Sequence, residues 1–177
     1  ISTYCLTHET ASLAPETTLN TEKQEKFYRF TWDFLASKGY PQYEISNFAP
    51  QKYWCMHNVN TWRMQEWVGF GPSAASQYRR QRWTNVASLK GWSKGETIDR
   101  YFLTDKILAA DSLIFGLRMN EGVQFSSLIK QFPSLQWEKF NSLIEKLLAS
   151  RYASFDKHIL KLTDEGRMVA DAIAGEI

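Results

Sequence analysis

The order of elements after Thr104 constrains the fold of this 177-residue chain more than any other feature. Apolar residues recur at helical spacing in three successive segments, which predicts three helices. These helices are expected over residues 104–119, 125–132 and 135–150. The third is the most regular, because Leu143, Ile144, Leu147 and Leu148 all fall on one face. Residue 104 therefore begins a largely helical unit, with Thr104 as the N-cap of its first helix.

A hairpin and a capped helix complete this unit. The strands are predicted over residues 152–155 and 158–162, with a turn at Asp156 and Lys157, and Thr163 caps the last helix. The succession resembles a winged-helix domain, so residues 104–177 are predicted to form a winged-helix-like α+β domain. Its 9 Lys and Arg stand against 10 Asp and Glu, a net charge of −1 that argues against binding to DNA.

Residues 1–103 follow a different pattern. A strand is predicted over residues 1–6, then a helix that begins at Thr21 with Gln24 completing a capping box and stops at Gly39. The next strand is predicted over residues 42–46. A strand, a helix and a strand in this order are typical of the βα units that build parallel sheets, so the overall class is α/β.

The composition excludes several classes of protein. Two cysteines, Cys5 and Cys55, cannot build a disulfide framework, and no metal site is predicted in this chain. The net charge is +2, no segment resembles a signal peptide, and no apolar run is long enough to span a bilayer. We therefore expect a cytoplasmic protein. The chain begins in a strand-like run without Met, so we expect a piece of a longer protein.

The stretch from Val68 to Ser76, VGFGPSAAS, is unusually poor in side chains. Gly69 and Gly71 follow a predicted short strand over residues 67–70 and would let a ligand approach the backbone closely. The stretch lacks the third glycine of the dinucleotide-binding fingerprint. The alternative is a tight strand-to-helix turn without a ligand.

Several polar residues are further candidates. His57 lies between Cys55 and Asn58 and has too few companions for zinc, so it is either a packed side chain or a residue that stacks on or ligates a haem. Glu9 and Glu44 each end a strand-like run, where α/β proteins place their sites, although such carboxylates are often simply solvated.

A cluster of arginines completes the candidates. Arg79, Arg80 and Arg82 would suit a bidentate clamp on a carboxylate or phosphate. The alternative is a solvated basic loop.

Several motifs occur together and in order: YEISNFA (43–49), HN with Trp62 (57–62), GFGPSA (69–74), Trp83 with Asn85, FGLRMNEGV (115–123) and LTDEG (162–166). Together they resemble the C-terminal half of the radical S-adenosylmethionine proteins related to oxygen-independent coproporphyrinogen III oxidase. YEISNFA is similar to the HemW-type haem chaperone branch of that family.

This resemblance implies a fold, a set of cofactors and a set of site residues. Residues 1–103 would be the C-terminal part of a partial (β/α) barrel, and residues 104–177 the C-terminal domain of the family. The parent protein would bind S-adenosylmethionine and a 4Fe–4S cluster. Contacts to S-adenosylmethionine are implied for Cys5, Gly69, Gly71, Ser73, Ala74 and Ala75. A cavity for haem or a porphyrinogen is implied to be lined by Tyr43, Glu44, Asn47, His57, Asn58 and Trp62.

The chain departs from the family pattern in informative places. The three closely spaced cysteines that ligate the cluster are absent, so no catalytic residue is expected here. Ala75, Thr61 and Asp111 stand where the family usually has a histidine, an aromatic residue and a glutamate.

Three functions follow as hypotheses. The first is haem binding and delivery to an acceptor protein, and the second is oxidative decarboxylation of coproporphyrinogen III by the parent protein. The third is a winged-helix interaction module without catalysis. The expected partners are haem or a porphyrinogen, the N-terminal half of the barrel and a haem acceptor.

Overall fold

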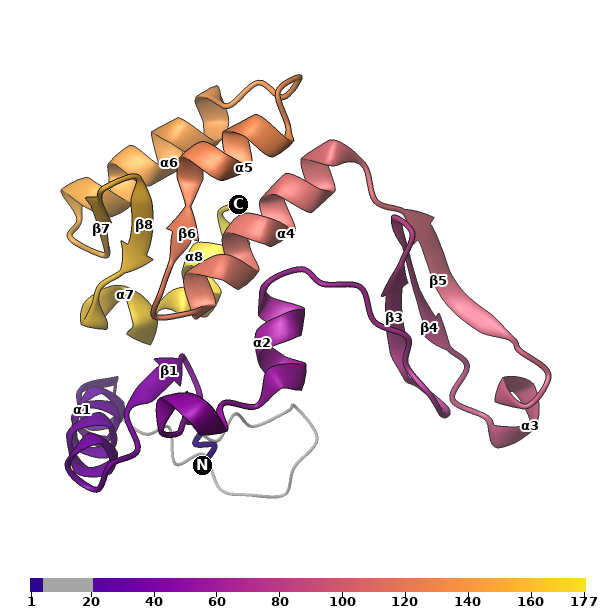
Figure 1. The fold of residues 1–177 in the computed structure, drawn as a ribbon, viewed down its shortest axis with the longest axis horizontal. Coiled ribbons are helices and arrows are strands. Elements are labelled where there is room, and N and C mark those ends of the chain that lie inside the picture. Colours follow the sequence, from indigo (N-terminus) through magenta and orange to yellow (C-terminus); the bar gives the residue numbers. More distant parts are fainter. Residues whose placement is uncertain (5–20) are drawn as a thin grey trace.

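The computed structural model describes residues 1–4 and 21–177. Three parts are visible in Figure 1: an N-terminal part around α1 and α2, a three-stranded sheet that projects to one side, and a C-terminal part built on α4. The predictions for residues 5 and 6, and for Glu9, lie outside the described residues, which includes the implied contact of Cys5 with a cofactor.

The N-terminal part contains α1 (Thr21–Ser37), β1 (Gln42–Glu44), β2 (Asn47–Phe48), the 3-10 helix η1 (Gln51–Tyr53) and α2 (Met56–Trp62). The predicted helix and its end are confirmed, since Gly39 adopts a φ of +85° just after α1. The predicted parallel pairing is wrong within the described residues. β1 pairs antiparallel with β2, because the chain turns back at Ile45 and Ser46, and Ser2 also meets Asn47 in an antiparallel bridge.

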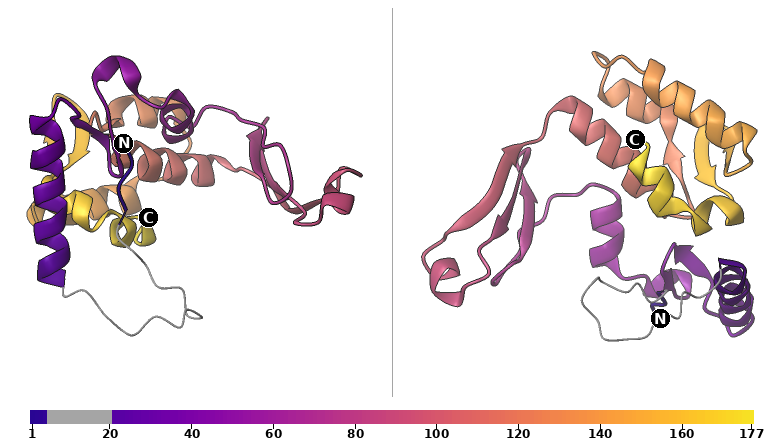
Figure 2. Two further views of the ribbon diagram at one scale, coloured as in Figure 1. Left: turned by 90° about the horizontal axis from the view of Figure 1, so that it is seen from below. Right: turned by 180° about the vertical axis from the view of Figure 1, so that it is seen from behind.

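Helix α1 presents aromatic residues to both of its sides. Phe27, Phe30 and Phe34 are exposed, whereas Trp32 lies under the guanidinium of Arg167 from the C-terminal part at 5.2 Å. The left view of Figure 2 shows α1 running along one side of the molecule. The helix therefore contacts the described chain through a limited surface.

The projecting sheet contains β3 (Ala75–Tyr78), β4 (Gln81–Asn85) and β5 (Thr97–Phe102), with the short α3 (Leu89–Trp92) at its tip. We call residues 75–102 the arm. Its strands pair antiparallel in the order β3-β4-β5. The short strand predicted over residues 67–70 is not formed, because only Trp67 pairs, in an isolated bridge with Gln77. Strand pairing begins instead after the glycine-rich stretch.

The C-terminal part follows the predicted order of helices and hairpin. It consists of α4 (Asp105–Arg118), β6 (Val123–Gln124), α5 (Phe125–Gln131), α6 (Glu138–Ala149), β7 (Ala153–Asp156), β8 (Ile159–Leu162), α7 (Asp164–Met168) and α8 (Ala170–Gly175). Thr104 and Thr163 cap α4 and α7 as predicted, each accepting a backbone N–H. The hairpin turn is one residue later than predicted, at Lys157 and His158, which both have positive φ.

The main core of the described chain lies in this C-terminal part. It packs α4, α5 and α6 against the sheet β6-β8-β7, with Leu113 and Leu160 almost fully buried. A second, smaller core joins Tyr43, Ala49 and Val59 of the N-terminal part to Met119 at the end of α4. This smaller core fixes the N-terminal part against α4.

Candidate functional site

The glycine-rich stretch folds closely on its own backbone. A Cβ at Gly69 would lie 2.3 Å from the carbonyl oxygen of Ala75, which is too close for any side chain. The Gly69 N–H donates to the Ser76 hydroxyl at 3.0 Å, and the Asn85 side-chain amide donates to the carbonyl oxygens of Gly69 and Gly71 at 3.3 and 2.9 Å. Gly69 is therefore required by the contact between the two sides of the bend itself.

The outer side of the bend is open. Gly71 has a φ of +104°, and no atom lies within 4 Å of the position that a Cβ would take. Ser73 and Ala75 are exposed, Ala74 is half-buried, and Phe70 is 86% exposed. The bend leads into β3, so the predicted strand-to-helix turn is wrong. Contact of these residues with a cofactor stays a prediction.

The hairpin of β1 and β2 buries the implied cavity residues Tyr43, Glu44 and Asn47. One carboxylate oxygen of Glu44 accepts the Ser46 N–H at 2.8 Å and a hydrogen bond from the Asn47 side chain, which also accepts from Ser2. Glu44 is fully buried. It is therefore neither a solvated carboxylate nor a carboxylate at an open edge of a sheet. It organises the turn of the hairpin.

The second oxygen of Glu44 faces α4. Arg118 Nε lies 3.8 Å from Glu44 Oε2, and neither atom has a hydrogen-bond partner. The Arg118 guanidinium lies 4.6 Å from the ring centroid of Trp62 on α2. The Ile45 N–H donates to the Arg118 carbonyl oxygen at 3.1 Å. Arg118 therefore connects the hairpin, α2 and the end of α4.

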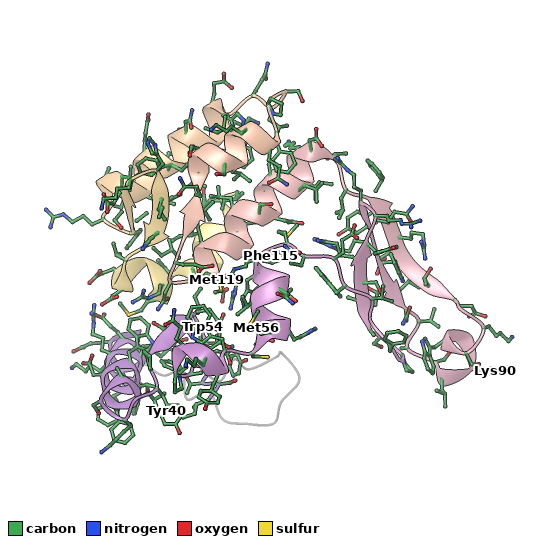
Figure 3. The ribbon with its side chains drawn as sticks, in the orientation of Figure 1. Tyr40, Trp54, Met56, Lys90, Phe115 and Met119 are labelled. Carbon is green, nitrogen blue, oxygen red and sulfur yellow. The ribbon has the colours of Figure 1, made fainter. Side chains whose placement is uncertain are left out.

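Helix α2 carries the other three implied cavity residues. His57 is exposed in the first turn, Asn58 is half-buried, and Trp62 packs on Phe115 of α4 with ring centroids 5.6 Å apart. In Figure 3 the labelled Phe115 and Met119 of the α4 region lie beside α2, with Met56 at its other end. The structure thus brings Trp62 into an interface between helices and leaves His57 facing outwards.

Tyr43 fixes the beginning of α2. Its hydroxyl accepts the Cys55 N–H at 3.2 Å, and its ring stacks on Trp54 with centroids 5.0 Å apart. Burial raises the pKa of Tyr43 above its ordinary value, so the phenol stays neutral at physiological pH. Tyr43 is therefore a packed hydrogen-bond acceptor that positions the exposed first turn of α2.

The arginine cluster is divided between two roles. Arg80 pairs with Asp105, and Arg82 pairs with Asp111 at 2.7 Å, so both tie the arm to α4. Burial would lower the pKa of Arg82, but the hydrogen bond and charge of Asp111 raise it overall. Arg79 instead lies over the ring of Tyr78. The three side chains therefore do not converge as a clamp.

Neither a metal centre nor a membrane span is seen in the described part of the chain. Within residues 1–4 and 21–177, no three His, Cys, Asp or Glu side chains are grouped so that they would hold a metal ion. No helix described there is both long and apolar enough to cross a bilayer.

Comparison with known proteins defines the class. Residues 103–169 match the family described as HemN C-terminal domain. The fold is similar to a solved structure titled "Coproporphyrinogen III oxidase (HemN) from Escherichia coli is a Radical SAM enzyme", with a TM-score of 0.68 and 18% identity, over 89% of this chain and 41% of that chain. The mixed α/β fold therefore matches the C-terminal part of a HemN structure.

Two curated proteins are similar to this chain in sequence. A Dictyostelium discoideum protein named radical S-adenosyl methionine domain-containing protein 1, mitochondrial, is 29% identical over 88% of this chain and 42% of its own length. The haem chaperone HemW of Lactococcus lactis is 25% identical over 82% of this chain and 39% of its own length. The chain carries a HemN C-terminal domain and is a distant homologue of HemW haem chaperones and radical S-adenosylmethionine domain proteins. It spans about two fifths of the length of these relatives.

Proposed function

We propose that this protein binds haem and delivers it to acceptor proteins. Relatives from Lactococcus lactis, Bacillus subtilis and Escherichia coli are named haem chaperone HemW and match between 78% and 87% of the chain. The observation on this chain that carries the proposal is the exposed His57 in the first turn of α2. Imidazole is a common axial ligand of haem iron.

The surroundings of His57 favour this role. Cys55 and Met56 beside it are exposed too, and both are side chains that ligate haem iron in other proteins. Trp62 anchors the far end of α2 on Phe115, so the helix is held while its first turn is open to a large flat ligand.

The two cofactors of the family, the 4Fe–4S cluster and S-adenosylmethionine, differ in how well the residues of this chain fit them. A 4Fe–4S cluster needs a set of thiolates that a chain with two cysteines cannot provide, so no step through a cluster is assigned to these residues. S-adenosylmethionine could approach the open outer side of the bend at Gly71, Ser73 and Ala75, which would offer backbone and one hydroxyl. When bound, S-adenosylmethionine supplies radical or group-transfer chemistry.

The assignment of the two domains is part of the proposal. The C-terminal part has the order helix, strand, two helices and hairpin that supports a winged-helix assignment for residues 104–177. We assign residues 1–103 to the end of a radical S-adenosylmethionine barrel. The remainder of that barrel would then be an intramolecular partner and would meet the exposed Phe27, Phe30 and Phe34 of α1.

A haem titration of the full chain tests the function. The wild type is expected to give a saturable Soret band. In His57→Asn this band is expected to shift and to lose intensity. His158→Asn is the matched control, because His158 is also exposed but lies in the β7-β8 turn, where its φ of 69° suits asparagine. A wild type without saturable binding, or a His57→Asn variant that keeps the wild-type spectrum, would refute the proposal.

A further inference from the structure

One face of the arm gathers three aromatic rings. Two of these rings, Tyr78 and Phe102, lie on either side of Gln81 in the sheet. Tyr78 pairs with Gln81 and Gln81 pairs with Phe102, so the three residues form a row across β3, β4 and β5. Residues directly opposite one another share a face, and Trp83 shares it because it follows Gln81 by two residues. We call this surface, formed by Tyr78, Gln81, Trp83, Arg100 and Phe102 with the turn residues Arg79 and Arg80, the stacking face.

Each ring of the stacking face carries a guanidinium group. Arg79 lies 5.2 Å from the centroid of Tyr78, Arg80 lies 5.4 Å from that of Phe102, and Arg100 lies 4.5 Å from that of Trp83. All three distances are within the range of a cation–π interaction. Arg100 also donates to the side-chain oxygen of Gln81 at 2.9 Å, which places its charge beside the centre of the row.

The opposite face of the arm is already occupied. Arg82 bonds to Gln77 at 3.1 Å, to Tyr101 at 3.4 Å and to Asp111 of α4 at 2.7 Å. Since alternate residues point to opposite sides of a sheet, the strand residues of the stacking face point away from this contact. Of the two turn residues, Arg80 also reaches α4, through Asp105. Phe102 is 59% exposed and Tyr78 is 39% exposed, so a ligand can reach both rings.

We propose that the stacking face binds the flat carboxylated ring of a tetrapyrrole, and this inference rests on the proposed haem function. Three adjacent strands place a flat platform about 10 Å wide under the ligand, from strand spacings of about 4.8 Å. The macrocycle packs on the layer of rings and guanidinium groups, and Arg79 and Arg100 bind its carboxylates. This contact holds the organic ring and requires no ligand to the iron.

The charge of the arm favours this small dianion over a nucleic acid. Residues 75–102 contain six Lys and Arg against two Asp and Glu. Two of these six, Arg80 and Arg82, are paired with Asp105 and Asp111. What remains suits a pair of carboxylates better than a phosphate backbone, which is bound through many basic contacts along its length.

Metal-free protoporphyrin IX is the probe, because it has the carboxylates and the ring but no iron. Arg79→Asn with Arg100→Gln is expected to weaken its binding to the full chain roughly tenfold, from two exposed charge contacts. Asparagine tolerates the left-handed φ of 47° at position 79. Lys90→Gln with Lys94→Gln removes the same charge at the tip of the arm, where Figure 3 shows Lys90, and is expected to bind like the wild type.

A second pair of variants tests stacking. Tyr78→Thr with Phe102→Thr keeps strand propensity and is expected to lose binding at least as strongly, whereas Tyr53→Thr removes an exposed ring outside the arm and should have no effect. Circular dichroism checks the fold of each variant. The wild type provides a test without substitution, because its affinity for protoporphyrin IX must fall as salt rises.

The outcomes separate this inference from the proposed function. Protoporphyrin IX that binds equally well to the wild type, to the Arg79/Arg100 variant and to the Tyr78/Phe102 variant overturns the inference, even where His57 still ligates haem. A His57→Asn variant that loses haem ligation but still binds protoporphyrin IX supports it. Binding of a poly(dT) oligonucleotide without binding of protoporphyrin IX overturns it in favour of a nucleic-acid surface. A wild type that binds neither haem nor protoporphyrin IX overturns both proposals.

Discussion

Removing the Glu44 side chain is expected to cost far more stability than removing its charge. In Glu44→Ala, the buried Ser46 N–H and Asn47 amide lose their acceptor. Each buried donor left without a partner costs about 1–3 kcal/mol, so the loss is about 4 kcal/mol before any cavity term. That is roughly a thousandfold change in the folding equilibrium, since each factor of ten is about 1.4 kcal/mol.

Glu44→Gln keeps an acceptor oxygen in the same place. It removes the charge that lies 3.8 Å from Arg118 Nε, a pair without a hydrogen bond. Arg118 is partly exposed and also lies 3.7 Å from Asp171, so its charge is not left buried and alone, and the variant no longer has to desolvate the Glu44 carboxylate. The expected cost is therefore about 1 kcal/mol. The difference between the losses of unfolding free energy in Glu44→Ala and Glu44→Gln therefore distinguishes hydrogen bonding from charge.

Urea denaturation of both variants, with the slope against denaturant concentration compared to the wild type, measures these free energies of unfolding. Glu121→Gln is the control, because Glu121 pairs with Arg63 on the surface and its loss should cost less than about 1 kcal/mol. Equal destabilisation by Glu44→Ala and Glu44→Gln would refute the reasoning, since the charge and not the acceptor would then hold the hairpin.

Two other substitutions test the bend and the attachment of the arm. Gly69→Ala places a Cβ 2.3 Å from a carbonyl oxygen of the same bend, so thermal unfolding should show a loss of about 3 kcal/mol or more; an unchanged melting temperature would contradict the packing. Arg82→Gln and Asp111→Asn should each make the arm easier to cleave in limited proteolysis, and the double variant should add little. Fully additive effects would show that the two side chains do not act as a pair.

The helices and their caps could be predicted because their signals are local. Thr104 and Thr163 each cap the helix that follows, as an oxygen-bearing side chain before an apolar repeat predicts. The stop at Gly39 is equally local, since a positive φ suits glycine. One local detail failed: the β7-β8 turn places Lys157 and His158 at positive φ, positions where sequence signals favour asparagine or glycine.

The arm could not be predicted because its strands depend on pairing rather than on alternation. Residues 81–85 mix arginine, tryptophan and asparagine, and both sides of the strand carry polar groups, so no apolar face marks it. Arg82 is held by Asp111, 29 positions away in the sequence, and no pattern within either segment indicates that contact. The turn at Arg79 and Arg80 is equally unmarked, because both residues adopt positive φ without being glycine or asparagine.

The site shows the same division between local and distant causes. A carboxylate at the end of a strand-like run is ordinarily solvated, yet Glu44 is fully buried because the C-terminal end of α4 covers the hairpin. Arg118, which lies in the FGLRMNEGV motif but is not among the predicted site residues, provides that cover and also holds Trp62. The YEIS and HN motifs thus lie beside one another through α4, and the first turn of α2 stays exposed because the opposite end of that helix is anchored.

The two glycines of the bend now have different explanations, and the difference bears on cofactor binding. Gly69 is accounted for by its contact with the Ala75 carbonyl oxygen, so its lack of a side chain is no evidence for a ligand. Gly71 has no such contact, but its φ of +104° is a backbone conformation that residues with side chains rarely adopt, so the conformation of the bend accounts for this glycine. A cofactor beside this backbone would therefore occupy the open space at Gly71 and contact the exposed Ser73 and Ala75. A side chain added at position 71 meets no protein atom, but the φ of +104° strains it, so such a variant loses stability as well as any cofactor contact.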